Sequence, residues 1–243
     1  MSTEAQSRAK PVEHHVRHRD VTGGWLRPAV FGVMDGLVSN VALVVGVAAA
    51  DAPTRVVLVA GLAGLFAGAF SMATGEYNSV RSQRELVAAE IAIERRELDR
   101  APAAEEAELA AIYRGKGLTK ELSNAVAREL SRDPEVAWRV HAREELGIDP
   151  DNLPSPWTAA GASFVSFLLG ALVPLLPYLA GMTDGALVAA CVAGAAALFV
   201  TGVAVSRFTS RGALYTGARQ LVLGSLAATV TYAVGSVVGV GVT

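Results

Sequence analysis

The chain has 243 residues, of which 52% are hydrophobic and only 18% charged, and its mean hydropathy is +0.39. Soluble domains average about 25% charged residues. Four uncharged runs each hold at least 20 residues: 56–75, 157–183, 185–206 and 220–243. Because about 20 apolar residues cross a bilayer, these runs exclude a soluble two-domain enzyme. The net charge of −2 and the lack of a long basic run predict no nucleic-acid partner.

The hydrophobic pattern predicts an all-α membrane protein with five transmembrane helices. The spans are expected at 28–50, 54–80, 156–179, 184–206 and 216–241. The chain then divides into a tail, a first pair of spans, a polar insert and a last group of three spans. Their limits are 1–27, 28–80, 81–153 and 154–243.

The insert between the second and third spans carries most of the charge and is also predicted to be helical. Its first helix, 81–100, continues the second span until Pro102 stops it. The next helix covers about 103–114, and another begins near Thr119. A last helix follows Asp133-Pro134, an N-cap residue followed by proline at the first helical position, and is expected to end near Gly147.

Basic residues flank one end of the predicted spans. Arg27 precedes the first span and Arg207, Arg211 and Arg219 surround the loop before the fifth, whereas the opposite loops offer only Arg55. Loops rich in Lys and Arg stay in the cytoplasm. We therefore expect the N-terminal tail and the insert on the cytoplasmic side. Five spans then place the C-terminus outside the cell or in a lumen.

Polar residues inside the first two spans predict a metal path. Asp35 lies about 10 Å from the cytoplasmic end of its span at 1.5 Å per residue. Carboxylates inside a span are costly and functional by default. Met72 and Glu76 share a helical face in the second span at a similar depth. Hard carboxylate oxygens combined with a soft thioether favour Fe²⁺ and its neighbours over Ca²⁺ or Mg²⁺.

Carboxylates also gather in the insert. Glu90, Glu94 and Glu97 fall on one face of its first helix, and Glu105 and Glu108 follow Pro102. Glu144 and Glu145 return on the last helix, with His141 one turn earlier. Two interpretations remain: a cation-binding cluster, because close carboxylates repel one another unless neutralised, or an ordinary solvated helical surface.

Glycines four residues apart occur in two spans, at Gly64/Gly68 and Gly235/Gly239. This spacing lets helices approach closely. It fits either packing within one subunit or a contact between two copies.

The motif Phe31-Gly-Val-Met-Asp35-Gly-Leu-Val-Ser-Asn40, together with Met72-Ala-Thr-Gly-Glu76-Tyr77 and Ser-Pro156-Trp157, resembles the vacuolar iron transporter (VIT) family. The resemblance covers nearly the whole chain, and the Ala-, Gly- and Val-rich spans are similar to those of bacterial members. It implies a homodimeric exporter of cytosolic Fe²⁺, and often of Mn²⁺, in exchange for protons. It implies no prosthetic group, because the metal is substrate and ligand.

Positions that match the family's metal ligands follow from this resemblance. In the insert they are Glu94, Glu97, Glu105, Glu108 and Glu145. In the spans they are Asp35 and Met72, beside Glu76 on the same path. Plant members also use methionines on the last insert helix, where this chain has His141 and Ala142. His141 is therefore a candidate nitrogen ligand.

The resulting hypothesis is a multi-pass metal/proton antiporter and not an enzyme, which serves iron detoxification or storage. It would lie in the plasma membrane of a bacterium or in a vacuolar or other organelle membrane of a eukaryote. Two alternatives stay open: a membrane-anchored ferritin-like iron oxidase and a metal sensor without transport. A di-iron oxidase needs two Glu-x-x-His motifs, whereas the insert has the reversed order His141-x-x-Glu144.

Overall fold

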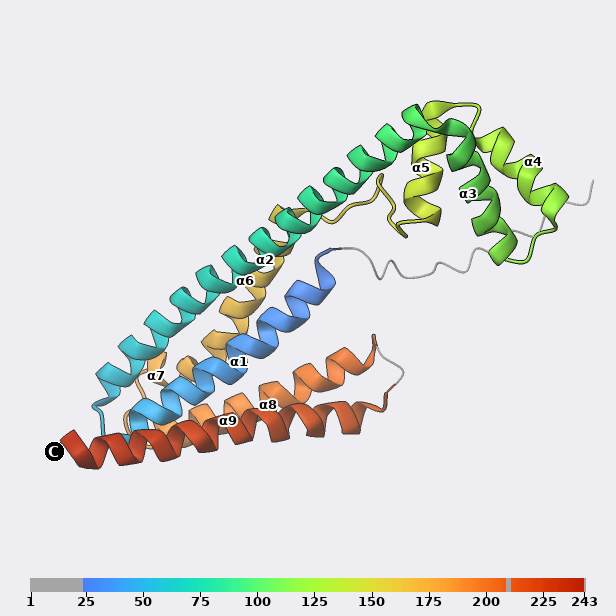
Figure 1. Ribbon diagram of the computed structural model, residues 1–243. Coiled ribbons are helices and arrows are strands. Elements are labelled where there is room, and N and C mark those ends of the chain that lie inside the picture. Colours follow the sequence, from blue (N-terminus) through green and yellow to red (C-terminus); the bar gives the residue numbers. More distant parts are fainter. Residues whose placement is uncertain (1–23, 209–210, 243) are drawn as a thin grey trace, which may run out of the picture.

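The computed structural model describes residues 24–208 and 211–242, and in this part of the chain every regular element is a helix (Figure 1). Most of the predicted tail lies outside the described residues. The elements are α1 (Leu26–Ala49), α2 (Thr54–Arg100), α3 (Pro102–Gly115), α4 (Lys120–Leu130), α5 (Pro134–Glu144), α6 (Pro156–Leu172), η1 (Val173–Leu175), α7 (Leu176–Leu179), α8 (Ala186–Ser206) and α9 (Ala213–Val242).

Five helical segments are long and apolar enough to cross a membrane. They are Leu26–Ala49, Thr54–Arg100, Pro156–Leu179, Ala186–Ser206 and Ala213–Gly239. Each overlaps one of the five spans predicted from the sequence. The protein is therefore a multi-pass membrane protein built from helices.

The third span is not the single helix that its hydrophobicity predicts. Regular α-helix ends at Leu172, a 3₁₀ turn follows over Val173–Leu175, and α7 completes the span. Pro174 lies in the 3₁₀ turn. Because proline lacks a backbone N–H and crowds the preceding turn, it interrupts the α-helical hydrogen bonds at this point.

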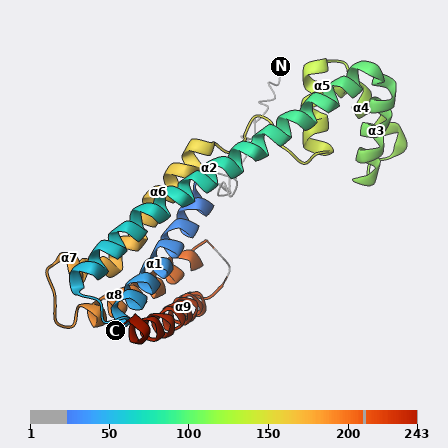
Figure 2. The ribbon, with the colours of Figure 1, turned by 60° about the vertical axis from the view of Figure 1, so that its left-hand side comes forward.

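α2 is long enough to leave the membrane. Its 47 residues correspond to about 70 Å, roughly twice the 30 Å hydrocarbon core of a bilayer. Its first part is apolar, and its charged second part extends away from the bundle to the short helices α3, α4 and α5 (Figure 2). One continuous helix thus connects the membrane bundle to the polar helices.

Local sequence explains the starts of two of these short helices. The Thr119 side chain accepts a hydrogen bond from the Leu122 N–H at the start of α4, and Asp133 does the same for the Glu135 N–H at the start of α5. Asp133 was predicted as this N-cap. α5 ends at Glu144, however, before the predicted end near Gly147, which makes Glu145 its C-cap residue.

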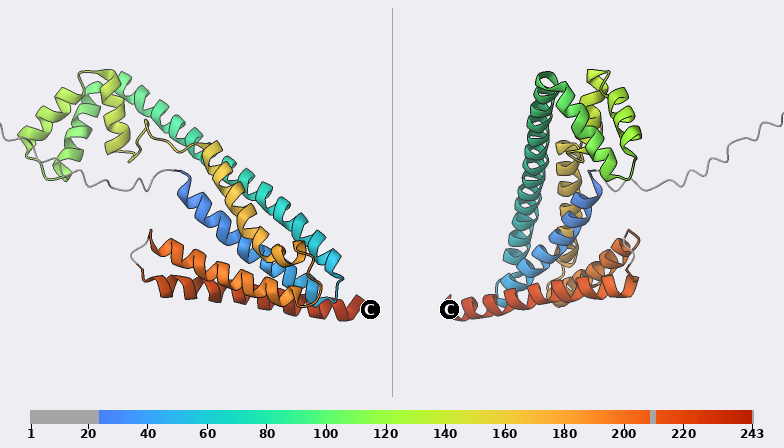
Figure 3. Two further views of the ribbon diagram at one scale, coloured as in Figure 1. Left: turned by 180° about the vertical axis from the view of Figure 1, so that it is seen from behind. Right: turned by 45° about the vertical axis from the view of Figure 1, so that its right-hand side comes forward.

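α1 is the central helix of the bundle and packs against α2, α6, α8 and α9. It lies between α2 and the α8–α9 hairpin in each view (Figure 3). Glycines allow this crowding: a Cβ on Gly170 of α6 would overlap the backbone oxygen of Val33 in α1. Close approach of backbones through small residues is typical of helix packing in membranes.

The two glycine pairs singled out in the sequence also pack within this chain. Gly64 faces Leu43, Gly68 faces the Phe167 ring, and Gly235 and Gly239 approach the backbone of the end of α1. Packing within one subunit therefore accounts for both pairs, and neither pair requires a second copy.

Candidate metal sites

The first candidate site lies where α5 and α3 pack against the charged end of α2. Glu94 of α2, Glu105 of α3 and His141 of α5 offer ligand atoms that all lie within 4.8 Å of one another. The Nδ1 atom of His141 is 2.9 Å from a carboxylate oxygen of Glu94, 3.8 Å from one of Glu105 and 3.6 Å from one of Glu145. Two successive helices and a third from farther along the chain thus direct carboxylates and an imidazole to one point.

Two buried members of this cluster have polar atoms without a hydrogen-bond partner. His141 is fully buried and Glu94 is 4% exposed, yet both imidazole nitrogens and Oε1 of Glu94 make no aligned hydrogen bond among the described residues. Buried polar atoms are nearly always paired. Ligands bound at about 2.0–2.2 Å to one ion lie at separations similar to those observed here. A divalent cation would satisfy Nδ1 of His141 and Oε1 of Glu94.

Electrostatics of the cluster favour a bound cation or proton. Burial, and then the charges of Glu145, Glu105, Glu97 and Glu108 in that order, together raise the pKa of Glu94 to about 7. Burial and the neighbouring Glu108 also raise the pKa of Glu105, which His141 partly counteracts. Glu97 and Glu108 are exposed at the edge of the cluster. The charges of Glu97, Glu105, Glu108 and Glu145 therefore all act on Glu94.

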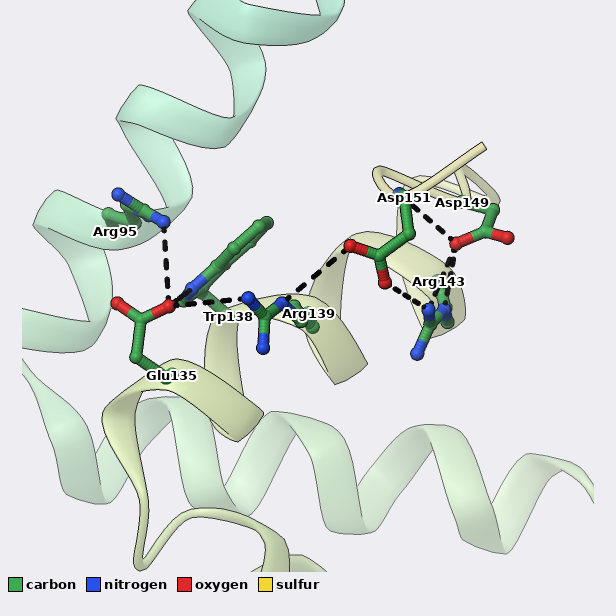
Figure 4. Close-up of polar contacts among 7 residues, drawn as sticks. All are labelled: Arg95, Glu135, Trp138, Arg139, Arg143, Asp149 and Asp151. Carbon is green, nitrogen blue, oxygen red and sulfur yellow. Dashed lines mark hydrogen bonds and ion pairs between the residues drawn. The ribbon is translucent and has the colours of Figure 1, made fainter. Parts of the chain in front are cut away.

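Polar contacts fasten α5 to α2 beside this cluster (Figure 4). Arg95 of α2 stacks on the Trp138 ring with 4.2 Å between the guanidinium carbon and the ring centroid. Trp138 Nε1 donates to Glu135 at 3.0 Å, and Glu135 lies 3.9 Å from Arg95. Because Arg95 follows Glu94 and Trp138 precedes His141 by nearly one turn, these contacts fix the two buried ligands relative to each other.

A second group of ion pairs holds the segment after α5. Arg143 donates to Asp149 at 2.9 Å and to Asp151 at 2.7 Å, and Arg139 lies 3.9 Å from Asp151 (Figure 4). The chain therefore folds back onto α5 directly after Glu145.

The second candidate site is a cavity of about 320 Å³ between α1, α2 and α6, within the spans. Its lining residues are Asp35, Ser39, Asn40, Leu43, Gly64, Gly68, Ser71, Met72 and Phe167. The structure thus brings the predicted Asp35 and Met72 to one cavity. Glu76 is half-buried one turn farther along α2 and does not line it.

Some residues take places that the sequence pattern did not predict. Glu144 lies outside the cluster, where it accepts from the Tyr113 hydroxyl at 3.4 Å and pairs with Lys116. Asn40 and Ser71 line the membrane cavity although neither was among the predicted ligands. Their signal was present, because a polar residue inside an apolar span is itself unusual.

Comparisons with known proteins place most of the chain among similar sequences. The model of the VIT family matches residues 26–236. Vacuolar iron transporter 2 of Oryza sativa subsp. japonica is 32% identical over 91% of this chain and 90% of its own length. Vacuolar iron transporter 1 of Arabidopsis thaliana is 32% identical over 93% and 91%, and the vacuolar iron transporter of Acanthamoeba castellanii is 37% identical over 79% and 75%.

Proposed function

This chain belongs to the VIT family, and from that premise we propose that it exports cytosolic Fe²⁺, and also Mn²⁺, across a membrane in exchange for protons. The observation that carries the proposal is the membrane cavity in which Asp35 and Met72 meet. A carboxylate and a thioether inside the spans give a metal ion ligands where lipid would give it none.

The cluster around His141 acts as the metal-capture site in this proposal. Glu94, Glu105 and His141 bind the ion, and the exposed Glu97, Glu108 and Glu145 raise its local concentration. The ion has to displace the proton that the raised pKa of Glu94 holds near neutral pH. Capture of metal therefore releases a proton on the side of the cluster.

Asp35 couples metal to protons inside the membrane. Its carboxylate binds either a metal ion or a proton, so a proton arriving from the far side displaces the ion. Met72 contributes a sulfur ligand for which no proton competes near neutral pH. Glu76 serves as a carboxylate at the entrance, one turn along α2 from Met72.

Assembly and orientation belong to the same proposal. Asp35 and Ser39 are exposed on the surface of the single chain, at a depth where lipid would surround them. A homodimer that covers this face would shield the carboxylate from hydrocarbon. In this proposal the N-terminal tail and helices α3–α5 lie in the cytoplasm, as the positive-inside rule predicts. The membrane is the plasma membrane or an organelle membrane, according to the organism.

The two rival functions are less well supported. A ferritin-like oxidase would use paired Glu-x-x-His motifs, but Glu144, the carboxylate of the reversed motif, pairs with Lys116 away from the cluster. A sensor that transports no metal would not explain why Asp35 and Met72 line a cavity within the spans. Iron is the transported substrate in this proposal, and no prosthetic group takes part.

Flux measurements test the proposal directly. Purified protein in proteoliposomes with an imposed proton gradient should take up Fe²⁺ kept reduced, and Asp35→Ala should abolish uptake. Asp184→Ala, which changes an exposed aspartate in the turn before α8, should transport like the wild type. Metal binding without gradient-driven uptake in the wild type would overturn the antiport and favour the sensor.

A further inference from the structure

Asn40 is a polar side chain buried near the middle of the membrane. It is 2% exposed and lies 14 residues into the 24-residue helix α1. At 1.5 Å per residue, it is about 21 Å along a helix of about 36 Å. Such a position needs an explanation, because a polar group without a partner is costly in the hydrocarbon region.

Half of the Asn40 amide has a clear structural task. Its Nδ2 donates to the backbone oxygen of Ala171 at 2.5 Å. Ala171 lies in the last turn of α6, where carbonyls lack intrahelical partners. Because a carbonyl only accepts, this bond fixes which end of the amide carries nitrogen and turns Oδ1 away from α6.

The other half of the amide has no such task. Oδ1 is buried and accepts no hydrogen bond in the described part of the chain. It faces Gly64 of α2, where an added Cβ would lie 3.4 Å away. Gly64 and Asn40 line the same cavity as Asp35 and Met72. The unpaired oxygen therefore lies at the inner end of the proposed metal path, opposite a glycine of α2.

We infer that Oδ1 of Asn40 is a further ligand for the metal ion in transit, reached after Asp35. This inference rests on the proposed function. An amide oxygen is a hard, neutral ligand that keeps its lone pairs at every physiological pH. It binds the ion without exchanging a proton. Coupling to protons thus stays at Asp35, while Asn40 replaces water ligands that the ion loses deeper in the membrane.

Two substitutions separate a ligand role from the structural bond to Ala171. Asn40→Ala removes both the donor and the oxygen, whereas Asn40→Asp keeps an oxygen at the same place and removes the donor. If Oδ1 binds the ion, Asn40→Ala should raise the KM for Mn²⁺ uptake about tenfold, the usual loss when a metal site is impaired. Asn40→Asp should leave the KM close to the wild-type value, because it keeps an oxygen at the same place.

The aspartate variant gives a second readout that a structural role would not change. It adds a protonatable oxygen to the path, so its uptake should depend more steeply on the pH of the far side than wild-type uptake does. Ser163→Ala is the matched control, because the Ser163 hydroxyl is also fully buried and unpartnered within the spans but does not line the cavity.

The outcomes also separate this inference from the proposed function. Equal increases of KM in both Asn40 variants with an unchanged pH profile, or a wild-type KM in Asn40→Ala, would overturn the ligand role while wild-type flux still supports antiport. If the variants lose thermal stability, the KM and the pH profile still decide between the two roles, because neither depends on how much folded transporter is present. Absence of wild-type flux would overturn the antiport itself.

Discussion

Glu94 and His141 are buried, and Oε1 of Glu94 and both imidazole nitrogens of His141 make no aligned hydrogen bond in the described protein. Each would weaken the fold if it had only packing to contribute, because an unsatisfied buried polar group costs about 1–3 kcal/mol. Their ligand atoms instead lie 2.9 Å apart, with Glu105 close by. The free-energy cost of leaving these atoms unpaired is consistent with a site that binds a cation.

The titration of Glu94 predicts how stability depends on pH. Its pKa is about 7 in the folded protein, against an ordinary value of 4.5. Between these values the folded state holds more protons than the unfolded state, so stability falls as pH rises. The melting temperature of the metal-free protein should therefore decrease from pH 5 to pH 7.5. Saturating Mn²⁺ should remove that decrease because it neutralises the cluster.

A matched pair of variants assigns this pH effect to the cluster. Glu94→Gln stays neutral and should give a melting temperature that changes much less over the same range. Glu121→Gln, which changes an exposed glutamate at the start of α4, should keep the wild-type slope. A slope that persists in Glu94→Gln would show that another group is responsible.

Individual elements show how far sequence reasoning extends. The five spans could be predicted because each apolar run has the length a bilayer requires, and Asp133 caps α5 because a short-range hydrogen bond determines it. The break at Pro174 depends on a residue visible in the sequence. The hydrogen bond from Asn40 to the Ala171 oxygen, in contrast, depends on how α1 and α6 pack.

Site residues follow the same division. Glutamates on one helical face could be identified by spacing, but their burial could not, because it depends on contacts among α2, α3 and α5. Glu94 and Glu105 are buried, whereas Glu97 and Glu108 are exposed. The sequence also grouped Glu144 with Glu145, although only Glu145 reaches the cluster. Sequence spacing therefore identifies which glutamates share a helical face, and the packing of the helices determines which of them are buried in the cluster.

The contact between α1 and α6 predicts a position-specific effect of alanine. Gly170→Ala should lower the melting temperature by several degrees, because its Cβ would overlap the Val33 backbone oxygen and force the helices apart. Gly161→Ala, in the same helix, has open space around its Cβ. It should be neutral or slightly stabilising, since alanine favours a helix over glycine by about 1 kcal/mol. Equal effects would contradict the close contact.

At the scale of the molecule, α2 connects the two candidate sites. Met72 lies in the membrane cavity and Glu94 in the cluster, 22 residues apart on one continuous helix. This spacing corresponds to about 33 Å. A metal captured at the cluster therefore has to travel along α2 before it enters the spans. Export in this direction is possible only if helices α3–α5 face the cytoplasm.

Cysteine labelling tests that orientation in a Cys191→Ala background, because Cys191 is the single cysteine. Asp184 lies in the turn before α8 and Glu121 at the start of α4. Since α2 and the α6–α7 span each cross the membrane once, the two positions should lie on opposite sides. A membrane-impermeant maleimide should label Asp184→Cys in intact bacterial cells, and Glu121→Cys only after permeabilisation. The reverse pattern would place the capture site outside and turn the proposed exporter into an importer.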